Sequence, residues 1–177
     1  CMTFLVKQVP GGLMSGWLNR AQSGETLDIK GPMGSFYLRT PTRPLLFLAG
    51  GTGLAPFLSM LKVLEKQAHA LPIHLIYGVT RDQDLVMVDR LVNFANRLPN
   101  FTFTTCVADP QTRHDKQGFV TQYMSPDILH DGDVDVYLCG PPPMVDAVQK
   151  HFKDIALNPV SFHYEKFTPN AATTISE

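Results

Sequence analysis

Three features that would point to a membrane, a metal cluster or a polyanionic partner are missing from the sequence. None of the apolar runs approaches the roughly 20 residues of a membrane-spanning helix. The three cysteines, Cys1, Cys106 and Cys139, are widely separated, too few for an all-cysteine iron–sulfur centre and odd in number for a disulfide framework. The net charge is −1, and lysine and arginine form no cluster. We therefore expect a protein of the reducing cytoplasm that binds no membrane, nucleic acid or metal ion.

The most informative segment is an apolar run that ends in glycines and continues as a helical pattern. Residues 45–49 are apolar, residues 50–53 are Gly-Gly-Thr-Gly, and residues 54–67 carry apolar side chains at helical spacing. This order is typical of a buried parallel strand, a phosphate-binding turn and a helix N-terminus. The spacing is not G-x-G-x-x-G, so the common dinucleotide fingerprint is absent. Because three glycines exceed what a tight turn needs, we expect a bound pyrophosphate rather than a turn without a ligand.

Beyond residue 44 the sequence alternates between strand and helix patterns. Strands are expected at residues 45–49, 73–77, 102–107, 134–138 and 160–164. Helices are expected at residues 54–67, 85–97 and 142–155, with one helical turn at 119–124. Five strands that alternate with helices predict the α/β class, with a parallel sheet wound on both faces.

Residues 1–40 predict a different, antiparallel architecture. They contain strand patterns at residues 2–9, 25–30 and 35–39 and a short helix at 13–21. So few elements cannot bury a full core, which indicates one part of an antiparallel domain. Because residue 1 is a cysteine that opens directly into a strand pattern, we interpret it as lying inside a larger protein. The expected divisions are a first domain at 1–41, a second at 44–167 and a polar, flexible tail at 168–177.

A second turn rich in glycine and proline, residues 139–144, follows the fourth strand of the predicted sheet. In an open parallel sheet, ligands bind beyond the carboxyl ends of the strands, near the point where the strand order reverses. A lone cysteine such as Cys139 is more often a buried structural thiol than a functional one. The three prolines after Gly140 favour a function, because they would form a rigid wall against which a flat ring could lie.

Two other strand ends carry acidic residues. Asp109 precedes a proline after the third strand, and it is either an ordinary turn residue or an acceptor for ribose hydroxyls that repels a 2′-phosphate. Glu165 and Phe167 end the fifth strand. By themselves they give no reason to prefer a function over strand-end solvation and core packing.

Together these motifs resemble the ferredoxin–NADP reductase superfamily, and within it the reductase components of aromatic-ring dioxygenases of the benzoate or toluate type. The resemblance covers residues 1 to about 167. It rests on the order and spacing of the segments at residues 9–18, 31–38, 49–56, 77–79, 139–145 and 164–167. It implies part of an antiparallel FAD-binding β-barrel followed by an NAD-binding α/β domain.

The resemblance also implies roles for individual residues. Met14 and Ser15 would hold the FAD pyrophosphate, and the turn at residues 51–53 would face the NAD pyrophosphate. The catalytic candidates, placed by resemblance around the nicotinamide and flavin rings, are Thr52, Cys139, Glu165 and Phe167. The implied cofactor-binding residues are Met14, Ser15, Gly50, Gly51, Thr52, Gly53, Gly78, Asp109, Cys139, Gly140, Pro141, Met144 and Phe167.

The activity implied by the resemblance is electron transfer from NADH through FAD to a 2Fe-2S centre, and from there to a terminal oxygenase component. NADP-dependent relatives often carry Ser-Arg where this sequence has Ala108 and Asp109, so we expect NADH to be preferred over NADPH. The family's Arg-x-Tyr-Ser flavin motif is absent, and a plant-type ferredoxin domain would lie outside this region. We therefore expect the chain to retain FAD poorly and to carry no 2Fe-2S centre itself.

Two alternatives remain open at this point. The chain could belong to another ferredoxin, flavodoxin or phenol hydroxylase reductase of the superfamily. It could also be an NAD-binding module without catalysis. The identities of the oxygenase and of its aromatic substrate are not encoded in this sequence, because that substrate would not contact this chain.

Overall fold

The computed structural model describes residues 2–166, and the predictions for Phe167 and the tail lie outside this range. The chain divides into two units, Cys1–Ser35 and Phe36–Glu177. The division falls earlier than residues 41–44, where the sequence pattern changes. The ring of Phe36 packs edge-on against Phe57 and Tyr137, which places the start of the second unit at this residue. The backbone N–H of Arg39 also donates a hydrogen bond to the Tyr137 hydroxyl at 3.0 Å.

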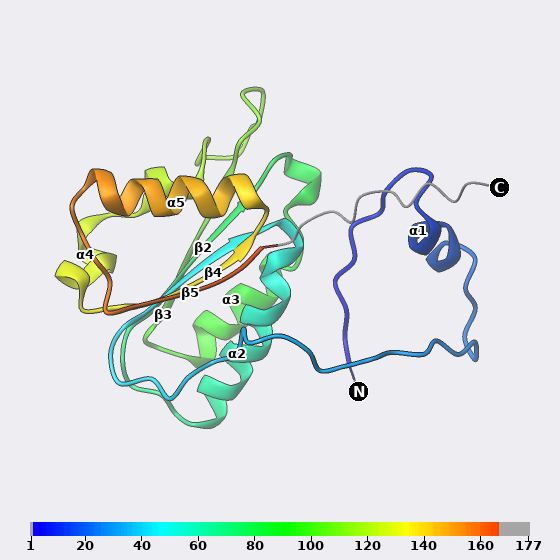
Figure 1. Cartoon of the computed structure of the whole chain (residues 1–177), viewed down its shortest axis with the longest axis horizontal. Coiled ribbons are helices and arrows are strands. Elements are labelled where there is room, and N and C mark those ends of the chain that lie inside the picture. Colours follow the sequence, from blue (N-terminus) through cyan, green and yellow to red (C-terminus); the bar gives the residue numbers. More distant parts are fainter. Residues whose placement is uncertain (1, 167–177) are drawn as a thin grey trace. The chain divides into compact units, whose positions relative to one another are not determined.

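A parallel sheet of five strands forms the centre of the second unit (Figure 1). Its strands are β1 (Leu45–Gly50), β2 (Ile73–Val79), β3 (Phe101–Val107), β4 (Asp135–Gly140) and β5 (Ser161–Lys166). The spatial order is β3-β2-β1-β4-β5, and every neighbouring pair is parallel. The predicted α/β class with a five-stranded parallel sheet is therefore confirmed.

Helices cover both faces of this sheet. α2 (Leu54–Lys66) and α3 (Val88–Arg97) lie on one face and α5 (Pro142–Asp154) on the other (Figure 1). α3 begins three residues later than the sequence predicts, because Met87 adopts a left-handed conformation with φ 62° immediately before it. The sequence pattern also missed α4 (Pro126–Leu129), a helix too short to show a period.

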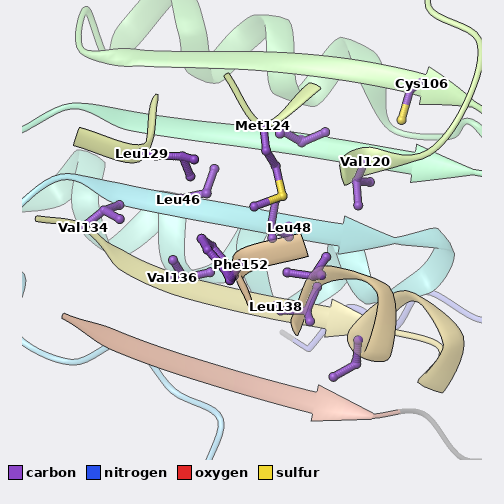
Figure 2. Close-up of a cluster of buried hydrophobic side chains, with 13 residues drawn as sticks. Leu46, Leu48, Cys106, Val120, Met124, Leu129, Val134, Val136, Leu138 and Phe152 are labelled. Carbon is purple, nitrogen blue, oxygen red and sulfur yellow. The ribbon is translucent and has the colours of Figure 1, made fainter. Parts of the chain in front are cut away.

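The central strands are buried on both faces, as their unbroken apolar sequences predict. Every residue of β1 and β4 is buried. Toward α5, Leu46, Leu48, Val136 and Leu138 meet Phe152 and the cluster shown in Figure 2. Toward α2, the opposite face carries an aromatic group in which Phe47 stacks on Phe57 and meets Tyr137 edge-on. Each such fully buried side chain contributes about 1.5–3 kcal/mol, so the core fixes the ends of β1 and β4 firmly.

The first unit contains one short helix, α1 (Leu13–Leu18), as predicted, but no β-ladder among its described residues. The strands predicted at 2–9, 25–30 and 35–39 are wrong for this structure, which has no strand there. A strand requires hydrogen bonds to a neighbouring strand, and residues 2–35 contain no strand with which another could pair. Large apolar side chains that would face a core are exposed instead, including Phe4 at 60 % and Met33 at 76 %.

Candidate functional site

The sheet places the ends of four strands beside one another at its carboxyl edge. β1 lies between β2 and β4, and this is where the strand order reverses. Gly50 at the end of β1 is in register with Gly78 of β2. On the other side, Ala49 is in register with Cys139, which is in turn in register with Glu165 of β5. The sequence-predicted residues of the NAD site therefore converge on this edge, while the roles assigned to them remain predictions.

The turn after β1 offers an anion the positive end of a helix. A single 3₁₀ turn, Gly51–Gly53, leads directly into α2, and the first turn of α2 contains no acidic residue. Gly51 has φ +54°, and a β-carbon added to it would meet nothing within 4 Å. The turn is thus open to a ligand at Gly51, and backbone N–H groups together with the helix dipole favour a phosphate there.

The other glycines of the site are required by packing. A β-carbon on Gly53 would overlap the carbonyl oxygen of Cys139, and one on Gly50 would lie 2.6 Å from the Met144 sulfur. A β-carbon on Gly78 would lie 2.7 Å from Val120. Contrary to the expectation from the sequence, these glycines are not in excess, because Gly50 and Gly53 are needed where the two turns touch.

The turn after β4 has few backbone donors. Pro141 caps α5, and Pro142 and Pro143 follow as its first two residues, so these positions carry no N–H. The next two N–H groups, those of Met144 and Val145, donate to the Pro141 carbonyl oxygen at 3.0 and 3.3 Å. The N-terminus of α5 is therefore poorly suited to an anion, and it has the rigid, apolar character predicted for a wall.

Cys139 forms the base of this wall as a neutral thiol. Its side chain is fully buried, and its Sγ lies 3.9 Å from Glu165 Oε2. Burial, reinforced by the Glu165 carboxylate, raises the pKa of the Cys139 thiol to about 12. Because a nucleophilic cysteine needs an accessible thiolate, the buried Cys139 is not suited to covalent chemistry, and its predicted place beside the nicotinamide ring stays a prediction.

Asp109 lies at the end of β3 and organises its own turn. Its backbone N–H donates to the Thr80 carbonyl, and its Oδ1 accepts the N–H of Gln111, both at 2.9 Å. Asp109 therefore has the role of an ordinary turn residue, which was one of the two roles expected from the sequence. The Thr112 hydroxyl donates to Asp82 and ties this turn to the loop after β2. Sequence reasoning did not find Asp82, because nothing in its local pattern marks it.

The predicted flavin residues lie in the first unit. The Ser15 hydroxyl oxygen is buried and accepts the Val9 N–H at 2.9 Å, while Met14 is half exposed. The Ser15 hydroxyl thus holds its own loop in place, and its hydrogen is still available to a ligand. Ser15 and Arg20 are among the residues that line a cleft of about 500 Å³. One hydroxyl donor and one cation fit a phosphate group, which is the part of FAD assigned to this loop.

Among residues 2–166, no helix combines the length and apolar character needed to span a membrane. Within the same residues, no three histidine, cysteine or acidic side chains gather as a metal site would require.

Comparison with known proteins identifies the class. Residues 47–150 match the family model of the oxidoreductase NAD-binding domain, and residues 1–37 match that of the oxidoreductase FAD-binding domain. The chain belongs to the oxidoreductase NAD-binding family, within the ferredoxin–NADP reductase-like fold.

Two curated relatives and one solved structure are similar to nearly the whole of this chain. The toluate 1,2-dioxygenase electron transfer component of Pseudomonas putida is 51% identical over 96% of this chain and 51% of its own length. The 2-halobenzoate 1,2-dioxygenase electron transfer component of Burkholderia cepacia is 52% identical over 95% of this chain and 50% of its own. A crystal structure of an Amycolatopsis cytochrome P450 reductase superposes with a TM-score of 0.76 at 32% identity, over 94% of this chain and 52% of that one. The chain thus spans about half the length of the curated relatives it matches.

Proposed function

We propose that this chain is the NADH-binding part, with a portion of the flavin-binding part, of the electron transfer component of an aromatic-ring dioxygenase. The proposed electron acceptor is inferred from the two relatives that are 51% and 52% identical to this chain. Both are named as dioxygenase electron transfer components. In it, electrons pass from NADH through FAD to a 2Fe-2S centre outside this region and on to the terminal oxygenase.

The observation that carries the proposal is the pairing of two unlike turns at the carboxyl edge of the sheet. The β1–α2 turn has an open glycine at a helix N-terminus, and the β4–α5 turn beside it is neutral and proline-rich. The first suits the pyrophosphate of NADH and the second suits its uncharged dihydronicotinamide ring. When bound, NADH supplies a hydride and FAD accepts it, which requires correct placement of the rings more than acid–base chemistry.

We assign the preference for NADH over NADPH to Asp109. Its carboxylate stands at the end of β3, where an adenosine ribose would lie if the pyrophosphate binds at the β1–α2 turn. The backbone N–H of Gln111 donates a hydrogen bond to Oδ1 of Asp109. The negative charge of the Asp109 carboxylate would repel a 2′-phosphate. The proposal also places the protein in a reducing compartment such as the cytoplasm, because Cys106 and Cys139 are free, buried thiols.

Titration of the chain with NADH and NADPH, followed by isothermal calorimetry, tests the coenzyme site. We expect binding of NADH at least about tenfold tighter than binding of NADPH, a difference of roughly 1.4 kcal/mol. Equal affinities would contradict the assignment of Asp109, and no binding of either coenzyme would contradict the function. The flavin absorbance of the purified chain should show FAD well below one equivalent.

The acceptor requires a test on the whole protein. Single-turnover reduction should deliver electrons from NADH to the oxygenase component faster than to a flavodoxin or an unrelated ferredoxin. A whole protein that binds NADH without reducing FAD would instead be a binding module, and that result would overturn the proposal.

A further inference from the structure

The sulfur of Met144 lies between the two turns of the coenzyme site. Met144 belongs to the first turn of α5, whereas Gly50 ends β1 and Gly140 ends β4. A β-carbon built on Gly50 would lie 2.6 Å from this sulfur, and one built on Gly140 would lie 2.8 Å from it. The thioether therefore occupies the space that side chains on both glycines would otherwise take.

The backbones around this sulfur are closely packed. A β-carbon added to Gly140 would lie only 3.3 Å from the Cα of Gly50, so the two strand ends leave little space between them. An aromatic side chain would not enter such a narrow space, but the slender, flexible thioether of methionine does. Met144 is half-buried and packs against the apolar cluster under α5, so one side of it is held by the core.

This contact links the two functions of the site. The β1–α2 turn would hold the pyrophosphate, and the β4–α5 turn would face the nicotinamide ring. A shift of one turn against the other changes the distance between those two binding groups. Small errors of placement of this kind are costly when a site must hold both ends of one ligand.

We propose that Met144 is a positioning residue for the coenzyme, whose thioether sets the spacing of the two turns. This inference rests on the proposed function, since it concerns the same NADH site. It differs from the role implied by the family resemblance, in which Met144 binds the cofactor itself. The side chain acts through Gly50 and Gly140.

The test is a double-mutant cycle on the chain, with the dissociation constant of NADH as the readout. Met144→Ala removes the spacer and should weaken NADH binding about tenfold, whereas Met144→Leu keeps the volume and should stay within about twofold. Gly140→Ala forces the thioether aside and should also weaken binding. In the Met144→Ala background the same glycine change should cost less than it does in the native chain, because the contact with the sulfur is gone and only the contacts of 3.3 and 3.4 Å with the Gly50 backbone remain.

Val148→Ala is the matched control. Val148 is fully buried one turn further along α5 and belongs to the same apolar cluster, but it is not among the atoms nearest to either glycine. This variant should lower the thermal unfolding midpoint and leave the NADH affinity unchanged. The inference is overturned if Met144→Ala behaves like Val148→Ala, or if the cost of Gly140→Ala is the same in both backgrounds. Failure of the native chain to bind NADH would instead refute the proposed function, and the inference would fall with it.

Discussion

The turns after β1 and β4 have similar positions in the fold and opposite chemistry. Both follow a fully buried strand that ends in glycine, and both lead into a helix of 13 residues. The turn before α2 combines an open Gly51 with the N-terminal donors of a helix. The turn before α5 carries three consecutive prolines, and its next N–H groups are already bound to Pro141.

A helix N-terminus is an anion site only when its donors are available. The macrodipole is similar in two helices of equal length, but an anion is held by the N–H groups that face it. Prolines remove those groups without disturbing the first turn of the helix. One strand–turn–helix unit can therefore hold a pyrophosphate while its neighbour presents a neutral surface.

The largest expected effect tests whether the two turns depend on each other. Gly53→Ala would place a methyl group against the Cys139 carbonyl, and neither backbone can move without disturbing a buried strand. We expect a loss of more than about 4 kcal/mol in the free energy of unfolding. Gly51→Ala, at an open position with positive φ, should cost only about 1 kcal/mol. Urea denaturation of both variants measures the difference, and equal losses would show that the turns are not in close contact.

A charge placed in each turn should separate their roles. Gly51→Asp puts a carboxylate where the pyrophosphate is proposed to bind, and we expect NADH affinity to fall about a hundredfold, or roughly 2.7 kcal/mol. Gly51→Asn has the same shape and tolerates the left-handed conformation, so it is the neutral control. Pro143→Asp adds the same charge to the exposed start of α5. If it weakened NADH binding as much as Gly51→Asp does, the distinction between the turns would be lost.

The neutral state of Cys139 makes stability depend on alkaline pH. Because burial raises the pKa of the folded thiol to about 12, the unfolded chain loses its proton first as the pH rises above the ordinary value of 9. The stabilisation is complete below pH 9 and declines between pH 9 and 12, by about 2 kcal/mol near pH 10.5. Cys139→Ser should reduce the slope in this part of the profile in denaturation experiments, leaving the contribution of Cys106, whose pKa burial raises to about 11. An unchanged slope would mean that the thiol is ionised or exposed in the folded chain.

The smallest effect concerns the prolines. Replacing Pro142 and Pro143 together with alanine restores two N–H groups to α5, but the pyrophosphate is proposed to bind at α2. We expect the NADH dissociation constant to change by less than about twofold, because the new donors face an uncharged ring. A large gain in affinity would show that the β4–α5 turn is a second phosphate site.

Much of the fold was predictable because its signals are local. The apolar runs of β1 and β4 and the helical spacing of α2 follow from side chains a few residues apart. The start of α3 was missed because Met87 takes a left-handed conformation that no residue type there demands. The strands expected in residues 2–39 were wrong because a strand pattern states only a preference, and pairing depends on a partner elsewhere.

The candidate site was predictable to a different degree. Its residues were found from turns and motifs, and the parallel sheet brought the strand ends together as topology requires. The sequence by itself determined that one turn has glycine before a helix and that the other has no N–H over three residues, since these are properties of covalent structure. Folding adds that Gly51 is open, that the neighbouring turn closes Gly50 and Gly53, and that Cys139 is a neutral thiol. Contact and burial depend on residues far apart in the chain, and no local pattern contains them.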